Sequence, residues 1–226
     1  MTLVSLIDHV VVAADTLERG VQWCEATLGV TPERGGEHSL MGTHNRLLRI
    51  ATPQFPRAYL EIIAINTEAS QPARRRWFDL DDPALRHQVH RQPRLVHFVA
   101  STADAAAALK ALARLGIERG PLVAAERATP SGLLRWQISV RRDGQRLFYG
   151  GLPTLIQWGE VHPADTLPAA GLALQSLHVC HPRAADLRAA HTAIGLQGVT
   201  LGDGAPNLTA TVATPKGIVT LESAGT

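Results

Sequence analysis

The chain has 226 residues, and 45% of them are hydrophobic, which is enough for one domain, or two small ones, around a sizeable core. Its 22 Lys and Arg residues nearly balance 20 Asp and Glu residues, so the formal charge of +2 supports neither a nucleic-acid partner nor a membrane partner. No apolar run reaches about 20 residues, the length that crosses a bilayer, and the first residues do not have the pattern of a signal peptide. We therefore expect a cytoplasmic protein whose two cysteines, Cys24 and Cys180, are reduced.

The first element is an apolar run with His9 in its middle, which is typical of a strand. Asp15 is suited to cap a following helix, and Gly29 is suited to end it. After a weaker strand, two alternating runs, at 44–51 and 58–65, predict two further strands. This order of elements is β-α-β-β-β.

The same order recurs twice along the chain, starting at His97 and at His178. Each copy has a capping cluster and a helix that ends in Leu-Gly-Ile or Ile-Gly-Leu. The strand pairs that follow are expected at 133–141 and 153–160, and at 208–215 and 217–224. We expect unit one at 1–66, an Arg/aromatic loop at 67–93, unit two at 94–160 and a partial third unit at 172–226.

Six stretches carry a resemblance to a known family, and they occur in order over most of residues 5–160. They are IDHVVVAADTLERG, GTHNRLLRI, YLEIIAI, RWFDLDDPAL, LVHFVAS and LPTLIQW. Together they resemble the glyoxalase-like domain branch of the vicinal oxygen chelate superfamily, which includes glyoxalase I, extradiol dioxygenases, methylmalonyl-CoA epimerase and bleomycin-resistance proteins. The resemblance implies an α+β fold in which two βαβββ units form one curled-sheet cup, with the partial third unit appended.

In that superfamily, metal ligands project into the cup from the first and last strands of each unit. The matching positions are His9, Glu61, His97 and Gln157. Two imidazoles and a carboxylate suit a divalent metal such as Fe, Mn, Ni or Zn and leave positions open for substrate oxygens. Gln157 stands where glyoxalase I has a glutamate base, and an amide cannot take a proton near neutral pH. The alternatives are that His9 is a core histidine and that Glu61 pairs with an arginine.

Five other residues are candidates for substrate binding: His44, Asn45, Arg76, Trp77 and Tyr149. The run ARRRW would close the cup and hold an anionic substrate, unless it is only a solvated surface. The third unit's equivalents of the ligands, His178 and Glu222, are expected to belong to a fold relic or a dimerisation piece. We see no pairing of a cysteine with a histidine that indicates covalent catalysis.

Two functions follow from these features. The first is a glyoxalase-like, metal-dependent lyase, isomerase or dioxygenase that acts on a small oxygenated substrate. The second is a metal-free small-molecule binding or sequestration protein of bleomycin-resistance type. A homodimer is expected because the sheet of the third unit needs something to cover it.

Overall fold

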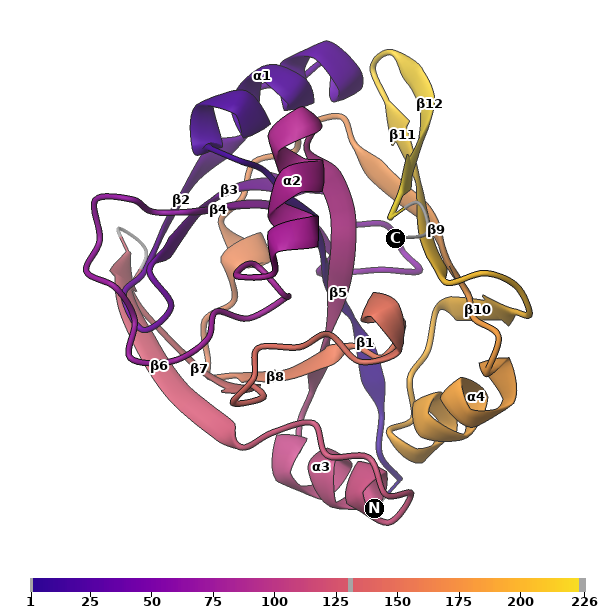
Figure 1. Ribbon diagram of the computed structural model, residues 1–226. Coiled ribbons are helices and arrows are strands. Elements are labelled where there is room, and N and C mark those ends of the chain that lie inside the picture. Colours follow the sequence, from indigo (N-terminus) through magenta and orange to yellow (C-terminus); the bar gives the residue numbers. More distant parts are fainter. Residues whose placement is uncertain (1, 130–131, 224–226) are drawn as a thin grey trace.

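The computed structural model describes residues 2–129 and 132–223, and in it the chain forms two β-sheets flanked by helices (Figure 1). Ala224, the last residue of the final predicted strand, lies outside the described residues. Units one and two share an eight-stranded sheet with the order β2-β3-β4-β1-β5-β8-β7-β6, and the third unit has its own sheet with the order β10-β9-β11-β12. The predicted α+β fold of tandem βαβββ units is confirmed.

The helices and strands occur unit by unit, in chain order. Unit one contains β1 (Ser5–Ala13), α1 (Leu17–Leu28), β2 (Glu33–His38), β3 (Thr43–Arg49) and β4 (Tyr59–Ile65). Unit two contains β5 (Arg94–Thr102), α3 (Ala105–Ala113), β6 (Leu122–Thr129), β7 (Gly132–Ser139), the 3₁₀ turn η1 (Phe148–Gly150) and β8 (Thr154–Trp158). A second 3₁₀ turn, η2 (Pro163–Asp165), precedes β9 (Ala173–Cys180), α4 (Ala184–Ala193), β10 (Val199–Gly202), β11 (Asn207–Thr214) and β12 (Gly217–Glu222).

The two units meet where β1 pairs with β5 in antiparallel fashion, at the centre of the large sheet. The pairing shifts register twice, between Ile7 and His9 and between Val11 and Val12. Such bulges bend a strand and change the direction of its side chains. The sheet curls so far that its two edge strands meet: a side chain in place of Gly36 on β2 would collide with Arg127 on β6.

The segment between units one and two, expected as a loop, contains a helix and fills much of the cup. Helix α2 (Pro83–Arg91) starts at Asp82, whose carboxylate accepts hydrogen bonds from the backbone N–H groups of Ala84 and Leu85. Apolar side chains of this segment pack against the concave face of the sheet, namely Trp77, Phe78, Leu80, Leu85 and Val89. The cup is therefore a packed core that leaves little open space.

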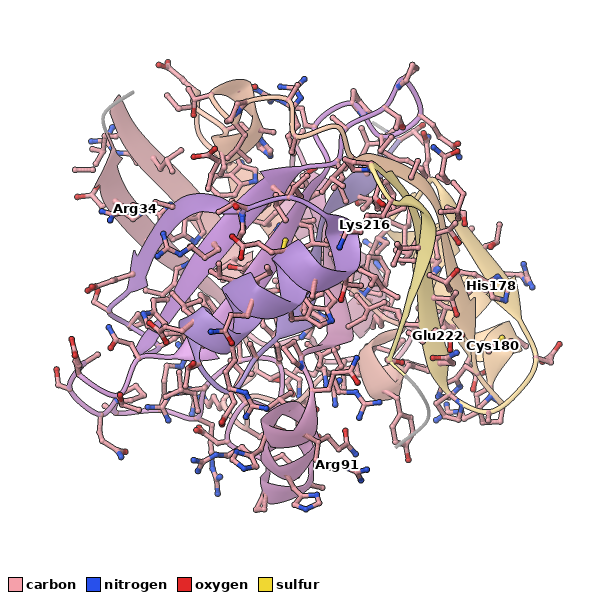
Figure 2. The ribbon with its side chains drawn as sticks, turned by 90° about the horizontal axis from the view of Figure 1, so that it is seen from above. Arg34, Arg91, His178, Cys180, Lys216 and Glu222 are labelled. Atoms are coloured by element: carbon pink, nitrogen blue, oxygen red, sulfur yellow. The ribbon has the colours of Figure 1, made fainter. Side chains whose placement is uncertain are left out.

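The third unit covers the other face of the large sheet. Its buried Leu177 and Val179 belong to the same core as Val10 and Phe98 of the central strands. Lys216, at the turn between β11 and β12, donates hydrogen bonds to the last carbonyls of α1 (Figure 2). Because this sheet is covered within the chain, the reason for expecting a homodimer no longer holds, and the oligomeric state stays a prediction.

None of the described helices is long and apolar enough to span a membrane.

Candidate active site

A cavity of about 40 Å³ remains inside the cup, between the sheet and the segment that fills it. Its apolar walls include Trp77, Phe78, Ile138 and Ile156. Its polar lining comes mostly from unit one: His9 on β1, His38 on β2, Asn45 on β3, Tyr59 and Glu61 on β4, and Arg127 on β6. The strands of the first unit thus bring the polar groups of a candidate site to one place.

Asp8 and His9 are neighbours in β1, and their side chains nevertheless meet. In a regular strand adjacent side chains point to opposite faces, but the bulge between Ile7 and His9 breaks this alternation. The Asp8 Oδ1 atom lies 2.6 Å from His9 Nδ1. Its other oxygen accepts hydrogen bonds from Trp158 Nε1 at 2.9 Å and from His162 Nε2 at 3.0 Å.

These contacts decide the charge of Asp8. Burial alone would raise its pKa, but hydrogen bonds from His162 and His9 outweigh burial and hold the pKa well below its usual range. His162 can donate from Nε2 because its Nδ1 accepts the backbone N–H of Ala164. Asp8 is therefore a carboxylate that fixes a proton on His9 Nδ1, and His9 Nε2 faces the cavity.

Glu61 lies opposite, with its Oε2 atom 3.6 Å from His9 Nε2. Its other oxygen accepts a hydrogen bond of 2.6 Å from the Asn45 amide. The orientation of Asn45 is fixed because its own oxygen accepts the backbone N–H of Gly36. The ring of Tyr59 stacks on His9, with centroids 4.5 Å apart. Both residues of the pair are therefore held in position, and Nε2 and Oε2 are left facing each other.

His38 completes the cluster as a neutral imidazole. Its Nε2 atom lies 3.4 Å from the Asn45 amide nitrogen, and its Nδ1 atom lies 3.0 Å from the Thr43 hydroxyl. Burial lowers the pKa of His38 to about 3, and the nearby Arg127 guanidinium acts in the same direction. His38 therefore serves as an acceptor that helps to hold Asn45.

His97, the second predicted imidazole ligand, is fully buried and has other partners. Its Nε2 atom accepts the backbone N–H of Thr154 at 3.1 Å and lies 3.3 Å from an Arg119 nitrogen. Burial, followed by the charges of Arg119 and Arg146, lowers its pKa well below the usual range. The lone pair that a metal would use is thus already engaged.

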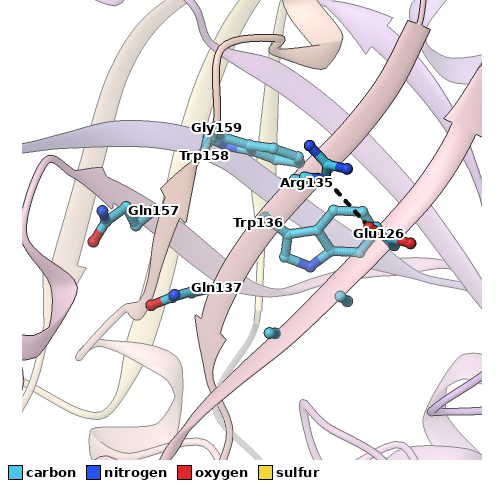
Figure 3. Close-up of a pocket in the computed structure, with 9 residues that line it drawn as sticks. Glu126, Arg135, Trp136, Gln137, Gln157, Trp158 and Gly159 are labelled. Atoms are coloured by element: carbon cyan, nitrogen blue, oxygen red, sulfur yellow. Dashed lines mark hydrogen bonds and ion pairs between the residues drawn. The ribbon is translucent and has the colours of Figure 1, made fainter.

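Gln157, the predicted fourth ligand, lies in another place. Its side-chain oxygen accepts the backbone N–H of Ala105 at the start of α3, at 3.0 Å. It lines a larger pocket of about 580 Å³ on β6, β7 and β8, which shares Trp136 and Trp158 with the His9 cavity and also contains Gln137 and the Glu126–Arg135 ion pair (Figure 3). As a strand neighbour of Trp158, it points to the opposite face of the sheet.

The predicted set of four metal ligands is therefore not brought together. Among the residues that the structure describes, no three His, Cys, Asp or Glu side chains are close enough to hold a metal ion. Of the four predicted ligands, His9 and Glu61 are the pair whose ligand atoms face each other. A three-ligand facial site does not fit this arrangement, and we derive no reaction step through a metal.

The five predicted substrate-binding residues separate in the same way. Asn45 and Trp77 line the cavity. His44 precedes Asn45 in β3 and faces away from it, near Glu18. Arg76 is bound to Asp81 by an ion pair of 2.6 Å. Tyr149 is 59% exposed and lines a different pocket, beside η1.

The structure also contains a cysteine–histidine pair that the sequence analysis did not expect. Cys180 Sγ lies 3.3 Å from His178 Nε2 on β9 (Figure 2). His178 Nδ1 lies 2.7 Å from the Thr200 hydroxyl. Thr209 stands between His178 and Glu222 in the register of the sheet, so these two predicted equivalents do not meet.

Several residues of the site were missed by sequence reasoning: Asp8, His38, Tyr59, Arg127, Trp158 and His162. The Asp8-His9 dipeptide was a signal, because a carboxylate next to a histidine in an apolar strand needs a partner. His162 had no signal, since it comes from the linker after unit two.

Two βαβββ units that share a curled sheet have the glyoxalase type of fold. The family model described as "Glyoxalase-like domain" matches residues 7–195. The chain belongs to this family, which confirms the resemblance stated from the sequence.

Several solved structures are similar to this chain, and the first of them supports the fold. A hypothetical protein from Staphylococcus aureus is similar with a TM-score of 0.60 and 15% identity, over 89% of this chain and 87% of that one. A methylmalonyl-CoA epimerase variant from Streptomyces coelicolor has a TM-score of 0.43 and 19% identity, over 71% and 99% of the two chains. The Mycobacterium tuberculosis epimerase has a TM-score of 0.39 and 17% identity, over 70% and 89%. No curated protein matches the sequence.

Proposed function

We propose that this protein is an enzyme that moves a proton on a small oxygen-bearing molecule in the cup, with His9 as the base. The observation that carries the proposal is the Asp8–His9 pair, whose second imidazole nitrogen opens onto a cavity. A histidine held in one tautomer by a buried carboxylate is a common general base.

The step itself uses only groups of this chain. His9 Nε2 takes a proton from a C–H or O–H group of the substrate, and the electron pair stays on the substrate as an enolate or alkoxide. Asp8, at 2.6 Å, stabilises the positive charge that forms on the imidazole. Glu61, held by Asn45, lies 3.6 Å from the same nitrogen and also faces that charge. Isomerases and lyases both begin with such a step.

Proton exchange tests this role directly. The protein is incubated in D₂O with small 2-oxo and 2-hydroxy compounds, and ¹H NMR follows the loss of C–H signals next to oxygen. We expect exchange with the wild type and with His44→Asn, whose side chain lies outside the cavity. We expect His9→Asn to be at least about 100-fold slower. Undiminished exchange in His9→Asn would contradict the proposal, and binding without exchange would favour a sequestration protein.

A divalent metal at His9 and Glu61 is the second candidate, favoured by one observation. A metal-ligating histidine usually donates its other N–H to a carboxylate, as His9 does to Asp8. Such an ion would polarise a substrate carbonyl when bound. Equilibrium dialysis against Zn²⁺ or Mn²⁺ checks it: about one ion per chain, lost in Glu61→Ala and kept in His97→Asn, would establish a two-residue site. No bound ion in the wild type would show that the metal prediction is wrong.

A further inference from the structure

The cavity at His9 lies beside a second, larger space, and the two share part of their lining. This cleft has a volume of about 340 Å³ and runs between the edge strands β2 and β6 and the linker of residues 161–168. Four residues line both spaces: Leu47, Arg127, Leu134 and Pro163. Because the inner cavity has only about 40 Å³, a substrate of several atoms needs further room, and the cleft beside Arg127 offers it.

Arg127 carries a buried donor for which the described residues provide no hydrogen-bond acceptor. Its Nη1 atom is buried and has no hydrogen-bond partner, and the side chain makes no ion pair with the part of the chain that the structure describes. The indole Nε1 of Trp77, which lines the same cavity, is also buried and has no hydrogen-bond partner in residues 2–129 and 132–223. Buried donors are normally satisfied, so two of them around one cavity indicate a ligand with acceptor atoms.

Strand β2 leaves room for this guanidinium. A Cβ atom at Gly36 would collide with Arg127 Nη1, and one at Gly35 would collide with the Asn45 amide. The absence of side chains at Gly35 and Gly36 therefore leaves room for the Asn45 amide and the Arg127 guanidinium beside β2. Burial lowers the pKa of Arg127, whereas the nearby Tyr59 and Glu61 favour its charged form.

We infer that Arg127, together with Trp77, anchors the carboxylate of a small substrate whose other oxygen-bearing end meets His9. The inference rests on the proposed function, and it assigns the substrate class: a small carboxylate with a second, neighbouring oxygen. A guanidinium offers a planar pair of donors that matches a carboxylate, and the unpaired charge in a half-buried place favours an anion over a neutral molecule.

Binding measurements test this assignment. The probes are pyruvate and lactate, their neutral analogue hydroxyacetone, and inorganic phosphate, with tryptophan fluorescence and calorimetry as readouts. We expect the wild type to bind pyruvate or lactate more tightly than hydroxyacetone. Arg127→Met should bind these carboxylates at least about 10-fold more weakly than the wild type does. Gly36→Ala, which displaces the guanidinium, should show the same loss, and Arg127→Lys should restore part of the affinity. Arg135→Met removes an exposed arginine of the neighbouring strand and should leave affinity unchanged.

Each other outcome has a clear meaning. Equal affinity of wild type and Arg127→Met for these carboxylates, or no binding of them to the wild type, overturns the inference. Phosphate that binds as tightly as pyruvate overturns the carboxylate assignment. If Arg127→Met loses affinity while His9→Asn keeps full proton exchange, the inference stands and the proposed function fails. Circular dichroism of every variant confirms that the fold is kept.

Discussion

Histidines in this protein show how strongly the surroundings of a residue decide its role. His9 lies between two carboxylates and faces a cavity, whereas His38 and His97 are buried beside arginines that disfavour a charged ring. His191 on α4 is a third kind: its Nε2 atom lies 2.9 Å from the carbonyl of Gly151, which ties α4 to η1. The residue type alone predicts none of these differences.

His191 gives the folded protein a dependence on pH. Burial lowers its pKa to about 4, from 6.5 in the unfolded chain. Below pH 6.5 the unfolded chain binds more protons at this histidine than the folded chain does. The contribution of His191 to the free energy of unfolding is therefore fully present above pH 6.5 and is lost as the pH falls towards 4. The loss is on the order of 3 kcal/mol. Urea unfolding of wild type and His191→Gln at several pH values between 7.5 and 4 measures it, since glutamine keeps the donor but does not titrate in that range.

The difference between the two proteins is the informative quantity, because His38 and His97 also titrate below their usual range. We expect the free energy of unfolding of His191→Gln to fall less steeply with decreasing pH than that of the wild type. Parallel pH profiles would show that His191 does not carry this dependence.

At the level of elements, the repeated strand pattern was sufficient to place His9 and Glu61 on the inner face of one unit. It was not sufficient for His97, because the residues that engage its ring come from elsewhere: Arg119 follows α3, and Thr154 begins β8. Bulges are a second reason why the strand pattern did not predict the whole site. A shift of one residue changes the face of a side chain, so Asp8 joins the site although the alternation of β1 would exclude it.

Gln157 illustrates the same limit and leads to a prediction. The structure gives it a role at the N-terminus of α3, where it accepts the N–H of Ala105 while Asp104 accepts that of Ala107. Gln157→Ala should lower the free energy of unfolding by about 1 kcal/mol, and Gln157→Glu, which keeps the acceptor, should restore it. Neither change should alter metal or carboxylate affinity. If Gln157→Ala loses metal or carboxylate binding while its stability is unchanged, Gln157 takes part in the site after all.

On the scale of the whole molecule, the third unit completes the core rather than adding a separate domain. Its inner face packs on the convex side of the large sheet, so the cup is supported from behind by residues that are distant in the sequence. The sequence predicted the third unit's elements but not this packing, because an amphipathic strand does not specify which surface will cover it. Because the third unit packs behind β1 and β5, it also helps to hold His9, which lies on β1, in place.

This arrangement predicts that all three units unfold together. Leu177→Ala, deep in the shared core, should lower the free energy of unfolding by about 2–5 kcal/mol. All four tryptophans lie between residues 23 and 158, so their fluorescence reports on units one and two, while circular dichroism reports on the whole chain. Both signals should shift together to lower urea concentration, whereas Ile218→Ala, on an exposed position of β12, should change stability by less than about 0.5 kcal/mol. An early circular dichroism transition with an unchanged tryptophan midpoint would show instead that the third unit unfolds independently.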